Sequence, residues 1–104
     1  MSYKEITFEE AKKILDSGGI IIDTREETEF VQGHADGAEL LPVDDITGDS
    51  AAWVIPDKDT PVVTYCRTGA RAILAAERLS ELGYKNVYTI GSIVGWEYGI
   101  VHGL

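Results

Sequence analysis

The stretch VVTYCRTGARAILAAERL, residues 62–79, places the only cysteine of the chain between a β-branched run and an alanine-rich run. VVTY is short and β-branched, which predicts a strand over residues 62–65. After Cys66 the pattern changes, because apolar residues recur every three or four positions. This spacing predicts a helix that begins near Ala70 and is ended by Gly83. The cysteine is therefore expected in a turn that leads from a strand into a helix.

Cys66 has two interpretations. Free cysteine is among the most buried residue types, so burial preference alone favours a residue that only fills space. The neighbouring residues favour a reactive cysteine instead, because the charged side chains of Arg67 and Arg71 are unsuited to a buried apolar position. Gly69 also allows the backbone to turn sharply. The first amides of a helix have no partners within it, and with the helix dipole they attract anions. Residues 67–71 therefore predict a loop that binds an anion and stabilises Cys66 as a nucleophilic thiolate.

The position of the arginine distinguishes two chemistries that use such a loop. Cysteine-dependent phosphatases share a C-x5-R signature, in which the arginine binds phosphate oxygens while the thiolate attacks phosphorus. Counted from Cys66, that arginine would be residue 72, which is Ala72, and the arginine occurs one residue earlier at Arg71. The shorter loop suits a smaller group on the cysteine, such as one extra sulfur atom.

Other segments predict further helices and strands. Thr7 and Glu10 form a capping-box pattern in front of a predicted helix over residues 8–16, and IIID (20–23) is typical of a strand buried on both faces. The remaining expected elements are a loop with a short helix after IIID, a short strand within 37–43, one or two helical turns around 51–54, a strand over 86–90, and a glycine-rich end in which a short C-terminal helix is possible. Strands separated by helical stretches favour an α/β domain with a mainly parallel sheet.

The length and composition favour a single globular domain over residues 1–104, with 44% hydrophobic and 26% charged residues. No apolar run is long enough for a membrane helix, and MSYKEITFEE lacks the pattern of a secretion signal, so the cytoplasm is the expected compartment. A single cysteine allows no internal disulfide, and with two distant histidines a structural zinc site is not expected.

The charge of the chain restricts its partners. A formal net charge of −9 repels nucleic acid and anionic membranes, so neither is expected as a partner. An anionic substrate would need a locally positive pocket.

With these motifs, the sequence resembles the rhodanese (thiosulfate sulfurtransferase-like) family over nearly the whole chain. CRTGARA resembles the family's C-R-x-G-x-R active loop, whose compact size is typical of sulfurtransferases rather than of the phosphatases that share the fold. LGYKNVYTIGSIVGW resembles the family's terminal motif, with Ser92 where the family often has a second glycine. IIIDTREETEFVQGHADGAELLPV resembles the family's first motif, with Ala35 where a larger aliphatic residue is common; the motif positions are occupied by Asp23, Arg25, Glu29, Phe30, Gly33, His34, Gly37, Ala38, Leu41 and Pro42.

The resemblance implies a rhodanese-like, doubly wound α/β domain with helices on both faces of the sheet. It also implies an enzyme whose cysteine, here Cys66, takes a sulfane sulfur from a small anion such as thiosulfate and becomes a persulfide. A cyanide or thiol acceptor, with a protein thiol among the candidates, then removes that sulfur, and no cofactor or metal is expected. The backbone around the persulfide is expected to be that of Arg67, Thr68, Gly69, Ala70 and Arg71, and the two arginines are expected to orient the donor.

Asp23 and Arg25 follow the first long strand at the sheet edge where Cys66 is expected, so we expect them to support the site. Locally, Asp23 is expected to cap a turn and Arg25 to pair with a carboxylate such as Glu29. His34 could act as a proton donor, but a structural hydrogen bond is favoured, because a preformed thiolate needs no strong base.

Large aromatic residues and charged runs have simpler expected roles. Trp53 and Trp96 are expected in core or rim packing rather than at a substrate mouth. His102 is expected in a mobile tail, and the acidic runs EETE and DDITGD are expected to be solvated surface.

Three functions remain open at this point. The leading one is a sulfurtransferase enzyme acting on thiosulfate or a persulfide. The second is a persulfide carrier for protein partners, because a chain with one cysteine cannot resolve its own persulfide. Phosphatase or arsenate reductase-type chemistry is a distant third. The physiological donor and acceptor and the oligomeric state are left undetermined by the sequence.

Overall fold

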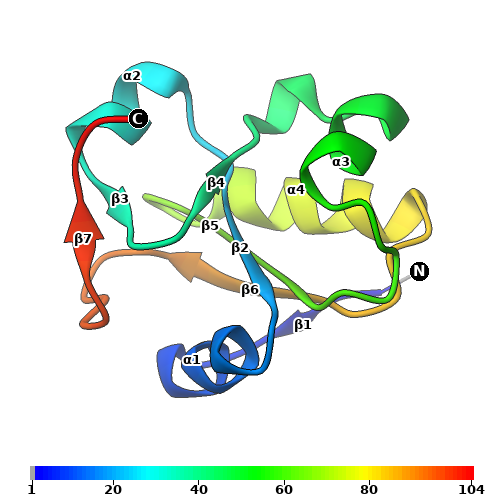
Figure 1. Ribbon diagram of the computed structural model, residues 1–104, viewed down its shortest axis with the longest axis horizontal. Helices are drawn as coiled ribbons and strands as arrows, with labels where there is room; N and C mark the ends of the chain where they lie inside the picture. Colours follow the sequence, from blue (N-terminus) through cyan, green and yellow to red (C-terminus); the bar gives the residue numbers. More distant parts are fainter. Residues whose placement is uncertain (1) are drawn as a thin grey trace.

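The structure, a computed structural model, describes residues 2–104 and is built around a five-stranded parallel sheet (Figure 1). The strand order is β1-β6-β5-β2-β4. These strands are β1 (Lys4–Glu5), β2 (Ile20–Asp23), β4 (Glu39–Leu40), β5 (Val62–Cys66) and β6 (Val87–Ser92). A separate antiparallel pair is formed by β3 (His34–Ala35) and β7 (Ile100–Val101).

The helices begin where the sequence supplies a cap. Thr7 and Glu10 form the predicted capping box in front of the first helix, with Glu10 N donating to Thr7 Oγ1 at 3.1 Å. Another capping box, formed by Thr47 and Ser50, begins a seven-residue helix of about two turns, as predicted for this segment, and the helix starts three residues earlier than the predicted range 51–54. The helices are α1 (Phe8–Asp16), α2 (Glu27–Gln32), the 3-10 helix η1 (Val43–Asp45), α3 (Gly48–Val54) and α4 (Ala70–Glu81).

Helices cover both faces of the sheet, as the sequence predicts. Side chains alternate along a strand, so neighbouring residues of β5 face opposite ways. Val62 belongs to a core cluster with residues of α3 and α4, whereas Val63 and Tyr65 belong to a second cluster with Ala11 of α1. Cys66 is an even step from Val62 and therefore points to the α4 side. The hydroxyl of Thr64, midway between them, donates to the carbonyl of Ala72 in α4 at 2.9 Å.

The direction in which the chain winds across the sheet reverses between β2 and β5. From β2 the chain moves to β4 on one side, and then crosses back to β5 and β6 on the other side. In open α/β sheets, ligands bind beyond the carboxyl ends of the strands at such a switch point. The loops that leave β2 and β5 are the two that flank it, and the second of these begins at Cys66.

The C-terminal segment differs from its prediction. The short helix considered for it is wrong, because residues 100–101 form β7 and pair with His34 and Ala35 of β3. His102 does not lie in a mobile tail, since the next residue, Gly103, donates its amide to the carbonyl of Val31 at 2.9 Å. Strands of two residues are too short to show alternation, so the sequence does not indicate β1, β3 or β7.

The two tryptophans have different surroundings. Trp96 is 8% exposed and packs edge-to-face against Phe8, which confirms its predicted packing role. Trp53 is 89% exposed, so packing was the wrong prediction for it. The reason is the helical period: α3 buries Ala51, and a residue two positions further along a helix lies on the opposite face.

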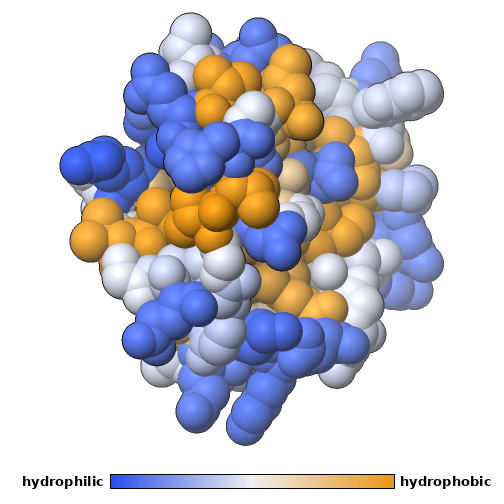
Figure 2. Space-filling view, turned by 60° about the vertical axis from the view of Figure 1, so that its left-hand side comes forward, coloured by the Kyte–Doolittle hydropathy of each residue, from blue (hydrophilic) through white to orange (hydrophobic). Residues whose placement is uncertain are grey.

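The side of the molecule that carries β3, β7 and α2 shows hydrophobic areas separated by hydrophilic ones (Figure 2). Ile100 and Val101 of β7 contribute to the exposed apolar surface. Among residues 2–104, no helix combines the length and the apolar composition required to cross a membrane.

Tyr65 joins three strands through one buried hydroxyl. The hydroxyl donates to Oδ2 of Asp23 in β2 at 2.6 Å and accepts from the amide of Ala35 in β3 at 3.0 Å. Burial, followed by the hydrogen bond to Asp23, raises the pKa of Tyr65 above its usual value. The phenol therefore stays protonated and remains a donor to Asp23.

Replacing Tyr65 with phenylalanine should destabilise the fold, because the amide of Ala35 loses its acceptor and the buried carboxylate of Asp23 loses one of its donors. We expect Tyr65→Phe to lower the free energy of unfolding by about 2–3 kcal/mol in urea denaturation. Tyr84→Phe is the matched control, since it removes one hydrogen bond, from Tyr84 Oη to the carbonyl of Ile55 (2.6 Å), and should cost about 1 kcal/mol. Equal losses in the two variants would contradict the role given to Tyr65.

Candidate active site

Cys66 ends β5 and lies beneath the first turn of α4. Its Sγ accepts a hydrogen bond from the amide of Gly69 at 2.9 Å. Gly69 has a φ of +106°, a conformation that other residues rarely adopt, and it also packs close to the backbone of Gly91. The loop can therefore curl back over the sulfur only because residue 69 is glycine.

The same loop presents further amides. In the part of the chain that the structure describes, the amides of Arg67, Thr68, Ala70 and Arg71 donate to no protein acceptor. Unpaired amides at a helix N-terminus attract negative charge. The loop is therefore able to bind an anionic group attached to Cys66, as the sequence predicts.

The Cys66 side chain is fully buried in this arrangement. The loop of residues 67–71 therefore separates Sγ from the solvent. Arg67 and Thr68 are among the exposed residues of that loop.

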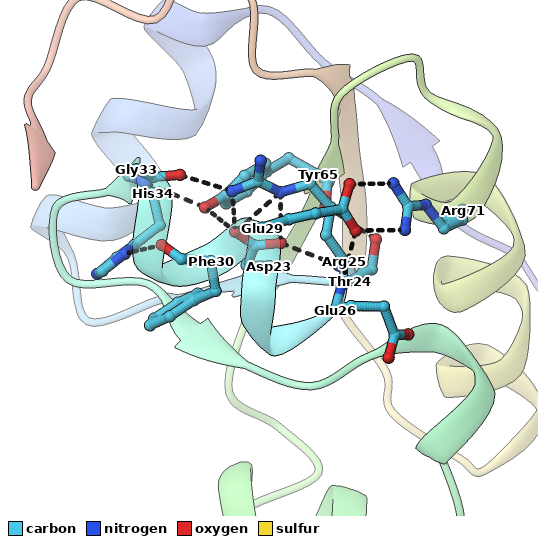
Figure 3. A network of polar contacts seen from close by, with 11 residues as sticks. Asp23, Thr24, Arg25, Glu26, Glu29, Phe30, Gly33, His34, Tyr65 and Arg71 are labelled. Atoms are coloured by element: carbon cyan, nitrogen blue, oxygen red, sulfur yellow. Dashed lines mark hydrogen bonds and ion pairs between the residues drawn. The ribbon is translucent and has the colours of Figure 1, made fainter. Parts of the chain in front are cut away.

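Arg71 has a different partner from the one the sequence suggested. It was expected to orient a donor anion, but its guanidinium forms two hydrogen bonds to Glu29 of α2, from Nη1 to Oε1 at 2.8 Å and from Nη2 to Oε2 at 2.9 Å (Figure 3). Hydrogen bonds from Arg71 lower the pKa of Glu29 to about 2. Hydrogen bonding to Glu29, with attraction to the charges of Glu29 and Cys66, raises the pKa of Arg71. The guanidinium of Arg71 is thus already occupied by the carboxylate of Glu29.

Asp23 and Arg25 form a second ion pair at the end of β2. Arg25 Nη2 donates to Asp23 Oδ2 at 2.7 Å and to the carbonyl of Gly33 at 2.7 Å, and the Arg25 amide donates to Asp23 Oδ1 at 2.9 Å (Figure 3). The last contact confirms the predicted turn cap. Arg25 pairs with a carboxylate, as predicted, but the partner is Asp23 and not the suggested Glu29, because a fully buried carboxylate needs a counter-charge more than a partly exposed one does.

His34 makes the structural hydrogen bond that the sequence favours. Its Nδ1 donates to the carbonyl of Phe30 at 2.8 Å, and the imidazole stacks on the Phe30 ring with centroids 3.6 Å apart. The ring thereby fixes the chain at the end of α2. This contact supports a role for His34 in packing rather than in proton transfer.

A cleft of about 270 Å³ lies beside the loop and is lined by Arg25, Glu29, Gln32, Gly33 and Arg67. Arg25 and Glu29 are already paired with other side chains. Within residues 2–104, Arg67 forms no ion pair, so it is the lining residue whose charge is available to an anion. Across these residues, His, Cys, Asp and Glu side chains nowhere form a group of three suited to a metal ion.

The sequence did not indicate three of the contacts around this site. Glu29 was a motif residue without an assigned role toward Arg71, and Gln32 carried no signal at all. Ser92 was noted only as a departure from glycine, yet its hydroxyl donates to the carbonyl of Arg67 at 2.5 Å. The presence of serine instead of glycine at this motif position is the one feature of the sequence that points to a role for Ser92.

The pair of Glu29 and Arg71 should make stability depend on pH in the acid range. Because folding lowers the pKa of Glu29 from 4.5 to about 2, its contribution is present above about pH 4.5 and is lost as the pH falls through 2. Both side chains are about one-third exposed, so Glu29→Gln should cost about 0.5–1 kcal/mol at pH 7. The difference from the wild type, measured by urea denaturation, should shrink as the pH is lowered.

The exposed pair of Lys12 and Asp16 on α1 provides the control. Asp16→Asn should change the free energy of unfolding by less than about 0.5 kcal/mol at pH 7. A Glu29→Gln effect that is equally small, or that grows as the pH is lowered, would show that the pair does not stabilise the site.

Comparisons with known proteins agree with this geometry. The model of the rhodanese-like domain family matches residues 7–98. The thiosulfate sulfurtransferase GlpE of Haemophilus influenzae (strain 86-028NP) is 35% identical over 99 residues, which cover 92% of this chain and 90% of the relative.

Solved structures show the same fold. A rhodanese with anions from E. coli superimposes with a TM-score of 0.76 at 32% identity, covering 82% of this chain and 99% of that one. A thiosulfate sulfurtransferase from Pseudomonas aeruginosa gives a TM-score of 0.83 at 29% identity and covers 97% of this chain, which corresponds to 20% of that protein. With a family match over most of its length and a full-length relative above 30% identity, this chain belongs to the rhodanese-like domain family.

Proposed function

We propose that this protein is a sulfurtransferase that uses Cys66 to carry a sulfane sulfur from thiosulfate, or from a persulfide, to a thiophilic acceptor. The observation that carries the proposal is the environment of Sγ, which accepts the Gly69 amide within a loop of otherwise unpaired amides. Similarity to thiosulfate sulfurtransferases supports the choice of sulfur over phosphate.

The reaction divides into two displacements at sulfur. In the first, the Cys66 thiolate attacks the outer sulfur of thiosulfate, the sulfur–sulfur bond of thiosulfate breaks, and sulfite leaves with the bonding electrons. In the second, cyanide or a thiolate attacks the outer sulfur of the persulfide, and the Cys66 thiolate leaves with the electrons of the Sγ–S bond. Neither step requires a proton transfer, an external oxidant or an external reductant.

The residues of the loop stabilise the negative charge in both steps. The persulfide is an anion, and the amides of residues 67–71 can donate to its outer sulfur. Arg67 attracts and orients the donor from the neighbouring cleft, while Arg71 contributes through its field. Asp23 and Arg25 support the site by holding the end of β2 beside the loop.

A persulfide carrier for protein partners is the second candidate. Cys66 is the only cysteine and is fully buried, so the outer sulfur has to pass to a nucleophile from another molecule that can displace the loop. Turnover with cyanide and small thiols distinguishes the two functions. An enzyme releases its sulfur to them rapidly, whereas a carrier keeps it until a protein thiol arrives.

Removal of the nucleophile tests the proposal directly. The wild type incubated with thiosulfate and cyanide should produce thiocyanate, and Cys66→Ala should reduce its formation to the uncatalysed background. A colorimetric thiocyanate assay measures both, and circular dichroism checks that the variant is folded. Absence of thiocyanate from the wild type, or undiminished output from Cys66→Ala, would refute the proposal.

Arg67 should govern the affinity for the donor. Since its exposed side chain provides the unpaired charge beside the cleft, Arg67→Gln should raise KM for thiosulfate about threefold to fivefold and leave kcat nearly unchanged. Lys13→Gln removes the same charge from the exposed surface of α1 and serves as the control. Equal changes in KM in the two variants would mean that only the net charge matters and that Arg67 has no specific role.

A further inference from the structure

Ser92 is brought next to the active loop by an irregularity in β6. The parallel register between β5 and β6 runs from Thr64 opposite Thr89 to Tyr65 opposite Gly91, so Ile90 is an extra residue in β6. Gly91 adopts a φ of +67°, which glycine allows without strain. As a result, Ser92 lies opposite Cys66 at the end of the strand pair.

The Ser92 hydroxyl is fixed by two hydrogen bonds. It donates to the carbonyl of Arg67 at 2.5 Å and accepts from the amide of Val94 at 3.1 Å. The next amide, that of Ile93, donates to the carbonyl of Cys66 at 2.9 Å. Residues 92–93 therefore hold two successive carbonyls at the point where the chain leaves β5.

The contact to Arg67 determines where the next amide points. The peptide between Arg67 and Thr68 is trans, so its carbonyl and its N–H point in opposite directions. The carbonyl points toward Ser92 in β6, and β5 lies between β6 and β2. The Thr68 N–H consequently points away from Ser92, and among residues 2–104 it donates to no protein acceptor.

We propose that Ser92 is a positioning residue for sulfur transfer: its hydroxyl fixes the peptide after Arg67 so that the Thr68 amide donates to the anionic sulfur on Cys66. This proposal rests on the sulfurtransferase function proposed above. A glycine at position 92 would offer no such donor. Without the hydroxyl, the Arg67 carbonyl loses its partner, and the peptide is free to rotate its N–H away from the sulfur.

The test compares Ser92→Ala with Ser92→Thr. Ser92→Ala should lower kcat/KM for thiosulfate about fivefold to tenfold, and Ser92→Thr, which keeps the hydroxyl, should retain activity within twofold of the wild type. Because the Thr68 amide stabilises an anion, the acid limb of the pH profile of kcat/KM should also move to higher pH in Ser92→Ala. A purely structural role would not move this limb.

Ser80→Ala is the matched control, because Ser80 makes the same type of bond, from its hydroxyl to the carbonyl of Ser2 at 2.7 Å, at the far end of α4. It should leave both kcat/KM and the pH profile unchanged. Thermal melts of the variants report any general loss of stability. If Ser92→Ala fails to fold, the kinetics of Ser92→Thr still test the proposal, because impaired activity in a variant that keeps the hydroxyl would refute it.

Three results would overturn the positioning role: wild-type kinetics in Ser92→Ala, impaired kinetics in Ser92→Thr, or faster turnover in Ser92→Ala. The last would mean that the bond only restrains the loop over Cys66. A wild type that forms no thiocyanate would refute the proposed function and the positioning role together. An active wild type with an unaffected Ser92→Ala would refute the positioning role alone.

Discussion

The buried carboxylate of Asp23 is the constraint on which the site depends. A charge at the end of β2 that is fully removed from water is tolerated only with a counter-charge and further hydrogen bonds, and Arg25 and Tyr65 supply both. Tyr65 immediately precedes Cys66, so the bond between Tyr65 and Asp23 also fixes the end of β5 relative to β2. The end of β5, and with it the cysteine, is thereby tied to the buried carboxylate at the end of β2.

The charged groups of the site differ in whether they are already paired with a group of opposite charge. Asp23 pairs with Arg25 and Glu29 pairs with Arg71, so four of the charged groups near the loop compensate one another. Arg67 and the unpaired amides of the loop remain as the groups that can meet an incoming anion. Under the proposed function, this local arrangement offsets the net charge of −9 where a small anion would bind.

Features coded by neighbouring residues were predictable, and features formed by distant segments were not. The turn at Cys66 was predicted because the strand pattern, the glycine and the helix pattern lie side by side in the sequence, and the turn cap at Asp23 spans two residues. The bond of Arg71 to Glu29 joins residues 42 apart in the sequence, and it exists because α2 and the start of α4 meet at one sheet edge. The role of Ser92 likewise depends on the bulge in β6, which no local pattern revealed.

Mass spectrometry of the protein after treatment with thiosulfate alone tests the central claim most directly. Because the chain has one cysteine, a persulfide can form at a single place. The account predicts that the wild type gains the mass of one sulfur atom, that the gain maps to the peptide containing Cys66, and that reduction with dithiothreitol removes it. An unchanged mass, or a gain that persists in Cys66→Ser, would contradict the account.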